Sequence, residues 1–293
     1  MDLNNIVGLF KSDYLDTLKQ AEQLGGVDLI ATSPPYADAR TYGMDCSFTD
    51  EDYQCLAHGL WSALRPGGHA LVNLDAPVRD WTGDGRGTER GLHPWRFMLY
   101  AHDVVGFRIP DRLAFGRQGL PGAYTGRFRN DWEPLLWLQK PGADGYLDKW
   151  ALVTESRYDC KDIQSGSRRD DGEVNNRAAS GRAVEEGVKH RGTLWDYGAV
   201  AHGHTGAPDI EEAGHPARWP YKLARDIVVC FSAPGALVCD PFLGAGTTMI
   251  AALEEGRRFI GGDLGQRQRD NKDWIEVARE IAINRNKQTT LFG

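Results

Sequence analysis

The segment Cys239–Thr248 (CDPFLGAGTT) constrains the fold of this chain more than any other feature of its sequence. It follows a short apolar stretch at Ala236–Cys239 and leads into a run of helical character at Gly246–Glu255. The two glycines between them permit a sharp turn, because glycine adopts positive φ angles without steric penalty. A second apolar stretch, Arg258–Asp263, comes next. Strand, glycine turn, helix and strand make a βαβ unit, which predicts a parallel sheet.

A second βαβ unit is predicted near the N-terminus. Val27–Thr32 is a short apolar run that ends at two prolines, which is typical of a buried strand running into a loop. Thr49–Leu64 has apolar residues at helical spacing, with Thr49 as the helix N-cap. The turn Arg65–Gly68 ends this helix, and His69–Leu74 is the next strand. Two such units place the chain in the α/β class.

The remaining elements are expected on either side of a polar central stretch. Helices are expected at Pro94–Val105, Trp219–Phe231 and Trp274–Asn284, and strands at Arg112–Phe115 and Trp132–Lys140. Residues 80–93 are rich in glycine and charge, and we interpret them as a mobile surface loop. Residues 141–213 have few periodic apolar positions, so we interpret them as a domain-sized insertion or a partly mobile region.

The composition suits one large α/β domain, or one domain with an insertion, because 41% of the 293 residues are apolar. No apolar run approaches the roughly 18 residues that span a bilayer, and the N-terminus is not a secretory signal, so we expect a cytoplasmic protein with no membrane partner. The five cysteines form no CxxC pair and are expected to be reduced. The charge of −7 argues against nucleic-acid binding, although a local basic cleft can coexist with an acidic remainder.

The glycine turn suits a nucleoside-like cofactor, because the backbone can approach a ligand there and the helix contributes N–H groups and a positive dipole. Asp263 follows the next strand, where a carboxylate can accept both hydroxyls of a ribose. Met249 stands where a dinucleotide fingerprint has its third glycine, and no lysine follows Gly246 as a Walker motif requires. Asp240 would repel a pyrophosphate but suits a ligand with a sulfonium and an ammonium group. These features point to S-adenosylmethionine.

The segment Ser33-Pro34-Pro35-Tyr36 has a different chemistry. The prolines fix φ and remove backbone donors, which leaves the Ser33 hydroxyl oxygen and the Pro34 carbonyl as acceptors beside the flat face of Tyr36. An exocyclic amine of a nucleobase is a poor nucleophile, because its lone pair is delocalised into the ring. Two acceptors that hold its hydrogens would turn the lone pair toward a methyl group, and Tyr36 would stack on the flipped base. Transfer would then be a direct in-line displacement.

Two other chemistries are disfavoured. Methylation at carbon 5 of cytosine requires a cysteine thiolate, usually after a proline, and none of the five cysteines follows a proline. His202 and His204 lack further ligand residues near them, so no metal site is expected, and direct transfer needs none.

Together, these residues resemble the DNA amino-methyltransferases of restriction-modification systems, which methylate an exocyclic amine of cytosine or adenine. The order of catalytic motif, target-recognition region and cofactor motif resembles the β class. Five further segments are similar to motifs of this family, namely Ser12–Leu18, Leu64–Gly68, Trp132–Trp137, His215–Pro220 and Gly256–Asp263. Two departures are Ser12 in place of the family's glycine and the polar segment Leu264–Asp273.

The resemblance implies a Rossmann-like S-adenosylmethionine-dependent methyltransferase fold, with a mostly parallel seven-stranded sheet, helices on both faces and a permuted motif order. Residues 1–140 would form the catalytic half, 141–213 an inserted target-recognition region and 214–293 the cofactor-binding half. The catalytic residues would be Ser33, Pro34, Pro35 and Tyr36. The residues that bind S-adenosyl-L-methionine would be Asp13 (near the adenine), Thr32, His215 and Pro216 (near the methionine part), Asp240, Pro241, Phe242, Gly244, Gly246, Thr247, Thr248 and Asp263.

The resemblance also implies a bacterial or phage-encoded enzyme, a monomer or homodimer, with double-stranded DNA as its partner. A cognate restriction endonuclease is a further partner that it allows. SPPY is more typical of cytosine-N4 methylation and DPPY of adenine-N6 methylation, so Ser33 favours cytosine. Adenine in DNA and a base in RNA remain alternatives, as does a homologue that binds DNA or cofactor without turnover.

Basic side chains in two segments are candidates for DNA contact, because arginine can read guanine edges and lysine can meet phosphates. The alternative is that they are solvated loop charges. In the predicted target-recognition region they are Arg157, Lys161, Arg168, Arg169, Arg177, Arg182, Lys189 and Arg191. Around the loop at 80–93 they are Arg79, Arg86 and Arg90.

Overall fold

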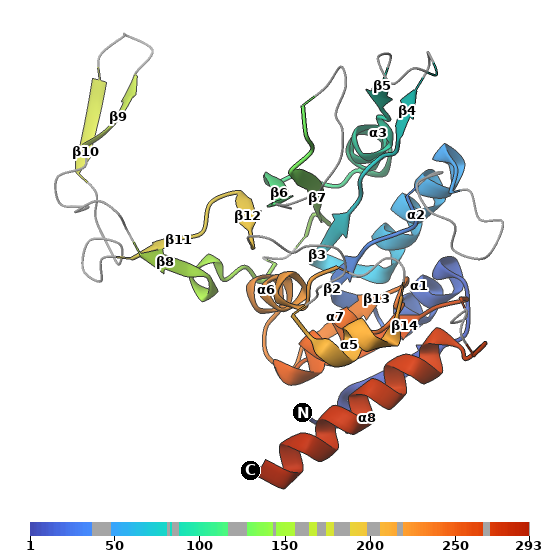
Figure 1. Cartoon of the computed structure of the whole chain (residues 1–293). Helices are drawn as coiled ribbons and strands as arrows, with labels where there is room; N and C mark the ends of the chain where they lie inside the picture. Colours follow the sequence, from blue (N-terminus) through green and yellow to red (C-terminus); the bar gives the residue numbers. More distant parts are fainter. Residues whose placement is uncertain are drawn as a thin grey trace. The chain divides into compact units, whose positions relative to one another are not determined.

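The structure is a computed structural model with two units, Met1–Leu147 with Thr193–Gly293 (unit 1) and Asp148–Gly192 (unit 2) (Figure 1). It describes residues 1–36, 48–80, 83, 88–116, 128–142, 145–155, 164–168, 174–178, 188–197, 206–215, 219–265 and 270–292.

An eight-stranded sheet forms the centre of unit 1, in the order β1-β14-β13-β2-β3-β7-β6-β12. Its strands are β1 (Ile6–Phe10), β2 (Val27–Thr32), β3 (Leu64–Asn73), β6 (Arg112–Gly116), β7 (Trp132–Gln139), β12 (Leu194–Asp196), β13 (Leu237–Asp240) and β14 (Arg258–Gly262). Only β7 is antiparallel to its neighbours, β3 and β6. The other neighbouring strands are parallel. The predicted Rossmann-like sheet is therefore confirmed, and the short edge strand β12 adds an eighth strand to the expected seven.

Helices cover both faces of this sheet (Figure 1). On one face, α1 (Tyr14–Gln23), α2 (Asp50–Ala63) and α3 (His93–Tyr100) share a core with buried residues of the strands. On the other, α6 (Tyr221–Phe231) packs against α7 (Thr247–Glu254). The other helices among the described residues of this unit are α5 (Pro208–Ala213), α8 (Trp274–Phe292) and short turns of 3-10 helix at Leu3–Asn5 and of π-helix at Ala101–Val105. No described helix has the length and apolar character that a membrane span requires.

The two predicted βαβ units diverge from a common point in the sheet. β2 leads through α2 to β3 on one side, whereas β13 leads through α7 to β14 on the other. β2 and β13 are neighbours, with Ile30 opposite Cys239. The carboxyl ends of strands at such a switch point form the usual ligand crevice of an open α/β sheet. The fold therefore brings Ser33–Tyr36 and Asp240–Thr248 to the same edge of the sheet.

Most predicted elements are present within a few residues. α2 begins after Thr49, as predicted, because the Thr49 hydroxyl accepts the Asp52 N–H (3.2 Å) and the Asp52 carboxylate accepts the Thr49 N–H (2.7 Å). α8 continues to Phe292, beyond its predicted end at Asn284.

The predicted turn at Arg65–Gly68 is instead part of β3. This strand begins directly after α2, and its pairing with β2 shifts register between Val27 and Leu29. The N–H of Gly67 donates to the carbonyl of Lys140, and the N–H of Lys140 donates to the carbonyl of Gly68. Gly67 has a positive φ (84°), so the chain still bends within this element, at the irregularity of its pairing with β2.

Part of the predicted loop at 80–93 forms a hairpin, β4 (Val78–Asp80) with β5 (Thr88–Arg90). The Arg90 guanidinium donates to the Asp75 carboxylate at 2.7 Å and to the carbonyl of Ala76 at 2.9 Å. The Arg90 guanidinium, a candidate for DNA contact, is therefore hydrogen-bonded to other residues of the protein. Arg86 and the side chain of Arg79 lie outside the described residues.

The described residues of unit 2 form a short 3-10 turn (Lys149–Ala151) and two antiparallel strand pairs. β8 (Val153–Glu155) pairs with β11 (Val188–His190), and β9 (Gln164–Arg168) pairs with β10 (Val174–Ala178). This unit lies within the stretch 141–213, whose last part contributes β12 and α5 to unit 1.

Candidate active site

A buried network around Asp240 joins the two segments at the switch point. Thr32 Oγ1 donates to Asp240 Oδ1 at 2.7 Å, and Thr248 Oγ1 donates to Asp240 Oδ2 at 2.7 Å. The N–H of Phe242 also donates to Asp240 Oδ1, at 3.1 Å. These bonds hold the ends of β2 and β13 and the start of α7 together, across a sequence separation of 208 residues between Thr32 and Asp240.

The Asp240 carboxyl can change its charge near neutral pH. Asp240 is only 3% exposed, and this burial raises the pKa of its carboxyl to about 6. Hydrogen bonds from Thr32, Thr248 and Phe242 oppose this rise, whereas the negative charge of Asp263 adds to it. A cation close to the carboxyl would lower the pKa again and favour the carboxylate.

The glycine turn between β13 and α7 has positive φ at Gly244 (51°) and Gly246 (85°). A Cβ on Gly246 would lie 2.9 Å from the Cβ of Ala278 on α8. A Cβ on Gly244 would lie 3.1–3.3 Å from imidazole atoms of His215. Gly246 thus allows the turn to pack against α8, and Gly244 allows it to approach His215.

Asp263 lies directly after β14 and beside this turn. Its Oδ2 accepts the N–H of Gly244 at 2.7 Å, and its Oδ1 accepts the N–H of Gly265 at 2.7 Å. Each carboxylate oxygen can accept a further hydrogen bond. Asp263 can therefore hold the turn and still accept the hydroxyls of a ribose.

Aromatic rings surround Phe242. Its ring stacks on Tyr14, with centroids 5.2 Å apart and 20° between the planes, and Phe48 packs edge-on against it at 5.8 Å. Asp13, which the resemblance places near an adenine, caps α1, because its Oδ1 accepts the N–H of Asp16 at 2.9 Å. Half-buried Phe242 and Tyr14 offer apolar faces to a purine ring.

The Ser33–Tyr36 loop is held by polar contacts of its last two residues. The Tyr53 hydroxyl, on α2, donates to the carbonyl of Pro35 at 3.0 Å. The Tyr36 hydroxyl lies 3.0 Å from Glu133 Oε2 and 3.2 Å from Asn73 Oδ1, both acceptors. Pro34 is buried and Ser33 is half-buried. Within the described part of the chain, the Ser33 hydroxyl forms no hydrogen bond, so it can accept one from a substrate.

The partners of Tyr36 are themselves fixed. Asn73 ends β3 and Glu133 lies near the start of β7, and their exposed fractions are 2% and 3%. Asn73 Nδ2 donates to Glu133 Oε2 at 3.2 Å and to the carbonyl of Pro134 at 3.1 Å. The network orients the Tyr36 ring through its hydroxyl.

The family model for DNA methylase (N6_N4_Mtase) matches residues 27–271. The chain belongs to this DNA methylase family. The family resemblance inferred from the motifs is thereby confirmed.

Two relatives illustrate the similarity of this family member to other methyltransferases. The orphan methyltransferase M.BamHII of Bacillus amyloliquefaciens is 29% identical over 260 residues, which cover 88% of this chain and 89% of that protein. The DNA adenine methyltransferase YhdJ of Escherichia coli K12 is 27% identical over 171 residues, which cover 58% of this chain and 51% of that protein.

Two solved structures share the fold. The PvuII DNA methyltransferase (cytosine-N4-specific) matches with a TM-score of 0.60 at 18% identity, over 93% of this chain and 90% of that chain. The complex of M1.HpyAVI with SAM matches with a TM-score of 0.54 at 17% identity, over 94% of this chain and 98% of that chain.

Most candidate residues of this DNA methylase lie at the switch point of the sheet, and a few come from other segments. Those at the switch point lie together, namely Thr32, Ser33, Pro34, Pro35, Tyr36, Asp240, Pro241, Phe242, Gly244, Gly246, Thr247, Thr248 and Asp263. His215 reaches the same turn from the segment after α5, whereas Pro216 lies outside the described residues.

Three residues that shape the site, Tyr53, Asn73 and Glu133, were given no role from the sequence, although Glu133 lies in the family-like segment Trp132–Trp137. Asn73 follows the apolar run Ala70–Val72 and precedes Leu74, and Glu133 is a charged residue in a mainly apolar strand. A polar residue in a buried strand needs a partner, so both could have been flagged from the sequence. Tyr53 gave no such signal, because it also fits an apolar helix position.

The candidate DNA-contacting side chains of the predicted target-recognition region are described only in part. Lys189 is exposed and Arg191 is half-buried. Arg157, Lys161, Arg169, Arg182 and the side chains of Arg168 and Arg177 lie outside the described residues. His202 and His204 do so as well, and the described part of the chain contains no group of three or more His, Cys, Asp or Glu that could hold a metal ion.

Proposed function

We propose that this DNA methylase transfers a methyl group from S-adenosyl-L-methionine to the exocyclic N4 amine of cytosine in double-stranded DNA. The observation that carries the proposal is the position of Ser33–Tyr36 beside Asp240–Thr248 at the switch point of the sheet. A base held by the first segment and a methyl donor held by the second would meet at this edge. The base reaches the site by flipping out of the duplex.

The residues of the turn fit this cofactor, which supplies an electrophilic methyl group on a sulfonium centre. Asp263 accepts the ribose hydroxyls, and Phe242 and Tyr14 provide apolar faces for the adenine. The Asp240 carboxylate contributes negative charge toward the sulfonium, and His215 borders the methionine part. Thr32 and Thr248 fix the carboxylate, whereas Pro241 and Thr247 shape the turn.

The catalytic loop prepares the amine for transfer. The Ser33 hydroxyl oxygen and the Pro34 carbonyl accept its two N–H hydrogens, which reduces delocalisation of the lone pair into the ring. Tyr36, oriented by Asn73 and Glu133, stacks on the base. With the cofactor bound, its methyl group would pass to N4 as the sulfonium becomes a neutral thioether, and the surplus N4 proton would go to water. Positioning is the main source of the acceleration, and no covalent nucleophile takes part.

Ser33 supports cytosine over adenine as the substrate. A serine in the first catalytic position is more typical of cytosine-N4 enzymes in the family that the chain resembles, and one of the structures that share its fold is described as cytosine-N4-specific. Adenine N6 is the second candidate, because YhdJ is named a DNA adenine methyltransferase. The same loop chemistry serves either amine.

The region 141–213, which contains unit 2, is the proposed reader of the target sequence. Its position between the catalytic and cofactor segments is that of the target-recognition region in the β class. The exposed Lys189 is suited to phosphate contact. Because M.BamHII is named an orphan methyltransferase, a solitary enzyme and one with a cognate endonuclease are both consistent with the proposal.

A labelled-methyl transfer assay tests the reaction. Duplex DNA is incubated with the protein and with cofactor that carries a tritiated methyl group, and label in the DNA is counted. The proposal predicts label in duplex DNA with the wild type and labelling about 100-fold slower with Ser33→Ala. Cofactor binding without transfer to any DNA would contradict it and favour a non-catalytic homologue.

A further inference from the structure

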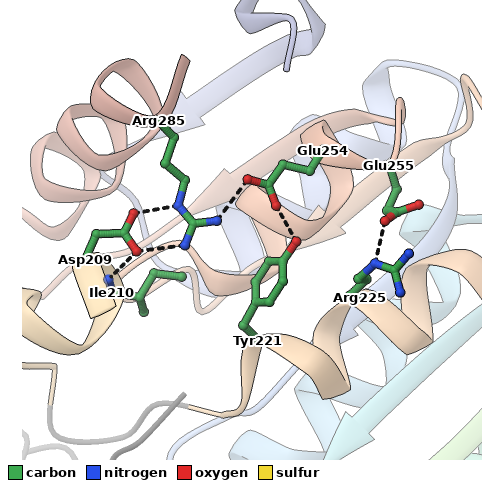
Figure 2. Close-up of polar contacts among 7 residues, drawn as sticks. All are labelled: Asp209, Ile210, Tyr221, Arg225, Glu254, Glu255 and Arg285. Carbon is green, nitrogen blue, oxygen red and sulfur yellow. Dashed lines mark hydrogen bonds and ion pairs between the residues drawn. The ribbon is translucent and has the colours of Figure 1, made fainter. Parts of the chain in front are cut away.

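Arg285 of α8 joins three other helices through one guanidinium group (Figure 2). Its Nε and Nη2 donate to the two carboxylate oxygens of Asp209 on α5, at 2.5 and 2.7 Å. Its Nη1 donates to Glu254 Oε1 on α7 at 2.9 Å, and the other oxygen of Glu254 accepts the hydroxyl of Tyr221 on α6. The Arg285 side chain is 17% exposed. A two-point pair of this kind fixes orientation as well as distance.

α5 leads directly to the glycine turn. Gly214 ends this helix in the left-handed conformation (φ 80°), and His215 is the next residue. The His215 imidazole lies over Gly244, as the 3.1–3.3 Å approach to a Cβ at this position shows. With a single residue between them, a displacement of α5 would move the imidazole.

α8 contacts the same region at two more points. Trp274, which is 5% exposed, packs against His215 with ring centroids 4.5 Å apart. One turn further along, Ala278 lies against Gly246. At 1.5 Å per residue, the contacts from Trp274 to Arg285 extend over about 16 Å of helix. One rigid element therefore touches the histidine, the turn and α5.

We propose that α8 positions the methyl-donor site and that Arg285 is its positioning residue. The ion pair with Asp209 holds α5, and α5 holds His215 over Gly244 in the arrangement that binds the cofactor. This inference rests on the proposed function, because it says how the donor site of that function is held. Arg285 and Asp209 act through α5 and His215, so losing the pair weakens cofactor binding and leaves turnover at saturating cofactor and DNA unchanged.

Calorimetric titration of the full-length protein with S-adenosyl-L-methionine tests the inference. Asp209→Asn removes one partner of the pair and leaves the Arg285–Glu254 bond in place. We expect the Kd to rise about tenfold and kcat to stay within about twofold of the wild type. The control is Arg225→Gln, which breaks the Arg225–Glu255 pair (2.6 Å) between α6 and the end of α7 (Figure 2). This pair does not involve α5, so the control should keep the wild-type Kd.

A double-mutant cycle separates positioning through His215 from a general loss of structure. In a His215→Ala background, Asp209→Asn should raise the Kd by less than about twofold, because the group it positions is gone. If Asp209→Asn does not fold, Arg285→Lys takes its place, since lysine keeps the charge but lacks the two-point geometry. An additive cycle, or a folded variant with the wild-type Kd, would overturn the inference. Absence of cofactor binding by the wild type would instead overturn the proposed function, and the inference with it.

Discussion

The fold holds Ser33 and Tyr36 in different ways. Tyr36 is anchored through its hydroxyl by two buried residues, Asn73 and Glu133. The Ser33 hydroxyl, by contrast, is not bonded within the described part of the chain. The proposed reaction requires this difference, because Tyr36 must position the base while Ser33 must accept a hydrogen bond from its amine.

Replacing Ser33 by alanine should therefore reduce turnover without reducing cofactor affinity. The variant lacks one of the two acceptors that orient the amine, and the loss of one preorganised group at a reacting centre costs about 100-fold in kcat. Methyl-transfer kinetics and cofactor titration measure the two quantities separately. Wild-type turnover by Ser33→Ala would show that the serine does not hold the amine.

The ionisation of Asp240 should make cofactor affinity depend on pH. Because the pKa of Asp240 is about 6 in the protein alone, about a tenth of it is ionised at pH 5 and most of it at pH 7. A cationic centre favours the ionised form, so the cofactor Kd should fall about tenfold as pH rises from 5 to 7. Titrations at several pH values measure this change.

Two variants assign this pH dependence. Asp240→Asn removes the titrating group and should flatten the profile. His215→Gln should leave the profile in place, although it removes another titratable side chain near the turn. An unchanged slope in Asp240→Asn would show that a different group controls cofactor binding.

At the scale of single residues, the sequence predicts which candidate positions are neighbours where the motifs are local. Asp240, Asp263 and the turn glycines lie beside one another as the spacing suggests. The detailed contacts could not be predicted. Both Asp240 oxygens bond to threonines, one of them 208 residues away, and only the sheet pairing sets that contact.

Among the elements, α8 was predicted as a last helix, and nothing in its sequence linked it to the turn. The contact at Gly246 depends on tertiary packing, because a Cβ there would lie 2.9 Å from the Cβ of Ala278. By contrast, α2 was predicted with Thr49 as its N-cap, because a capping box involves only four consecutive residues, here Thr49–Asp52.

Gly246→Ala should destabilise the protein and weaken cofactor binding by pushing the turn away from α8. Gly235→Ala is the matched control, because Gly235 also has a positive φ (78°), whereas a Cβ on it would meet no other atom within 4 Å. Both variants bear the backbone strain, about 1 kcal/mol, and only Gly246→Ala adds the clash. Urea unfolding and cofactor titration of both proteins measure the difference. Equal effects of the two substitutions would contradict the packing role of Gly246.

At the scale of the whole molecule, the buried His69 should influence stability against acid. His69 is 1% exposed, and its Nδ1 accepts the Trp137 Nε1–H at 3.1 Å. Burial lowers the pKa of His69 to about 4, below its ordinary value of 6.5. Between these values the unfolded chain binds more protons here than the folded chain. The contribution of the neutral His69 to the free energy of unfolding is on the order of 3 kcal/mol. This contribution is complete above pH 6.5 and is lost as pH falls through 4.

Urea unfolding between pH 4 and 7 measures this effect. His69→Asn keeps an acceptor for Trp137 but does not titrate, so its free energy of unfolding should fall less with acid than that of the wild type. Asp240 contributes with the opposite sign, because its raised pKa favours the folded state at low pH, and it is common to both proteins. Parallel pH profiles for the two proteins would contradict the assignment to His69.

The division of the molecule into units could be predicted only in outline. The polar composition of residues 141–213 distinguishes this stretch from the rest of the chain. Its elements β12 and α5 nevertheless belong to unit 1. β12 pairs with β6, and its buried Trp195 stacks on Phe231 of α6, contacts between distant segments that composition cannot reveal. The sheet itself was predictable, because two βαβ patterns imply parallel strands whatever the order.

Mass spectrometry of nucleosides identifies the amine that receives the methyl group, which we propose is cytosine N4 held by the Ser33–Tyr36 loop. Duplex DNA is incubated with the protein and S-adenosyl-L-methionine, digested and analysed. We expect N4-methylcytosine with the wild type and its formation about 100-fold slower with Ser33→Ala. N6-methyladenine as the sole product, or 5-methylcytosine, would contradict it.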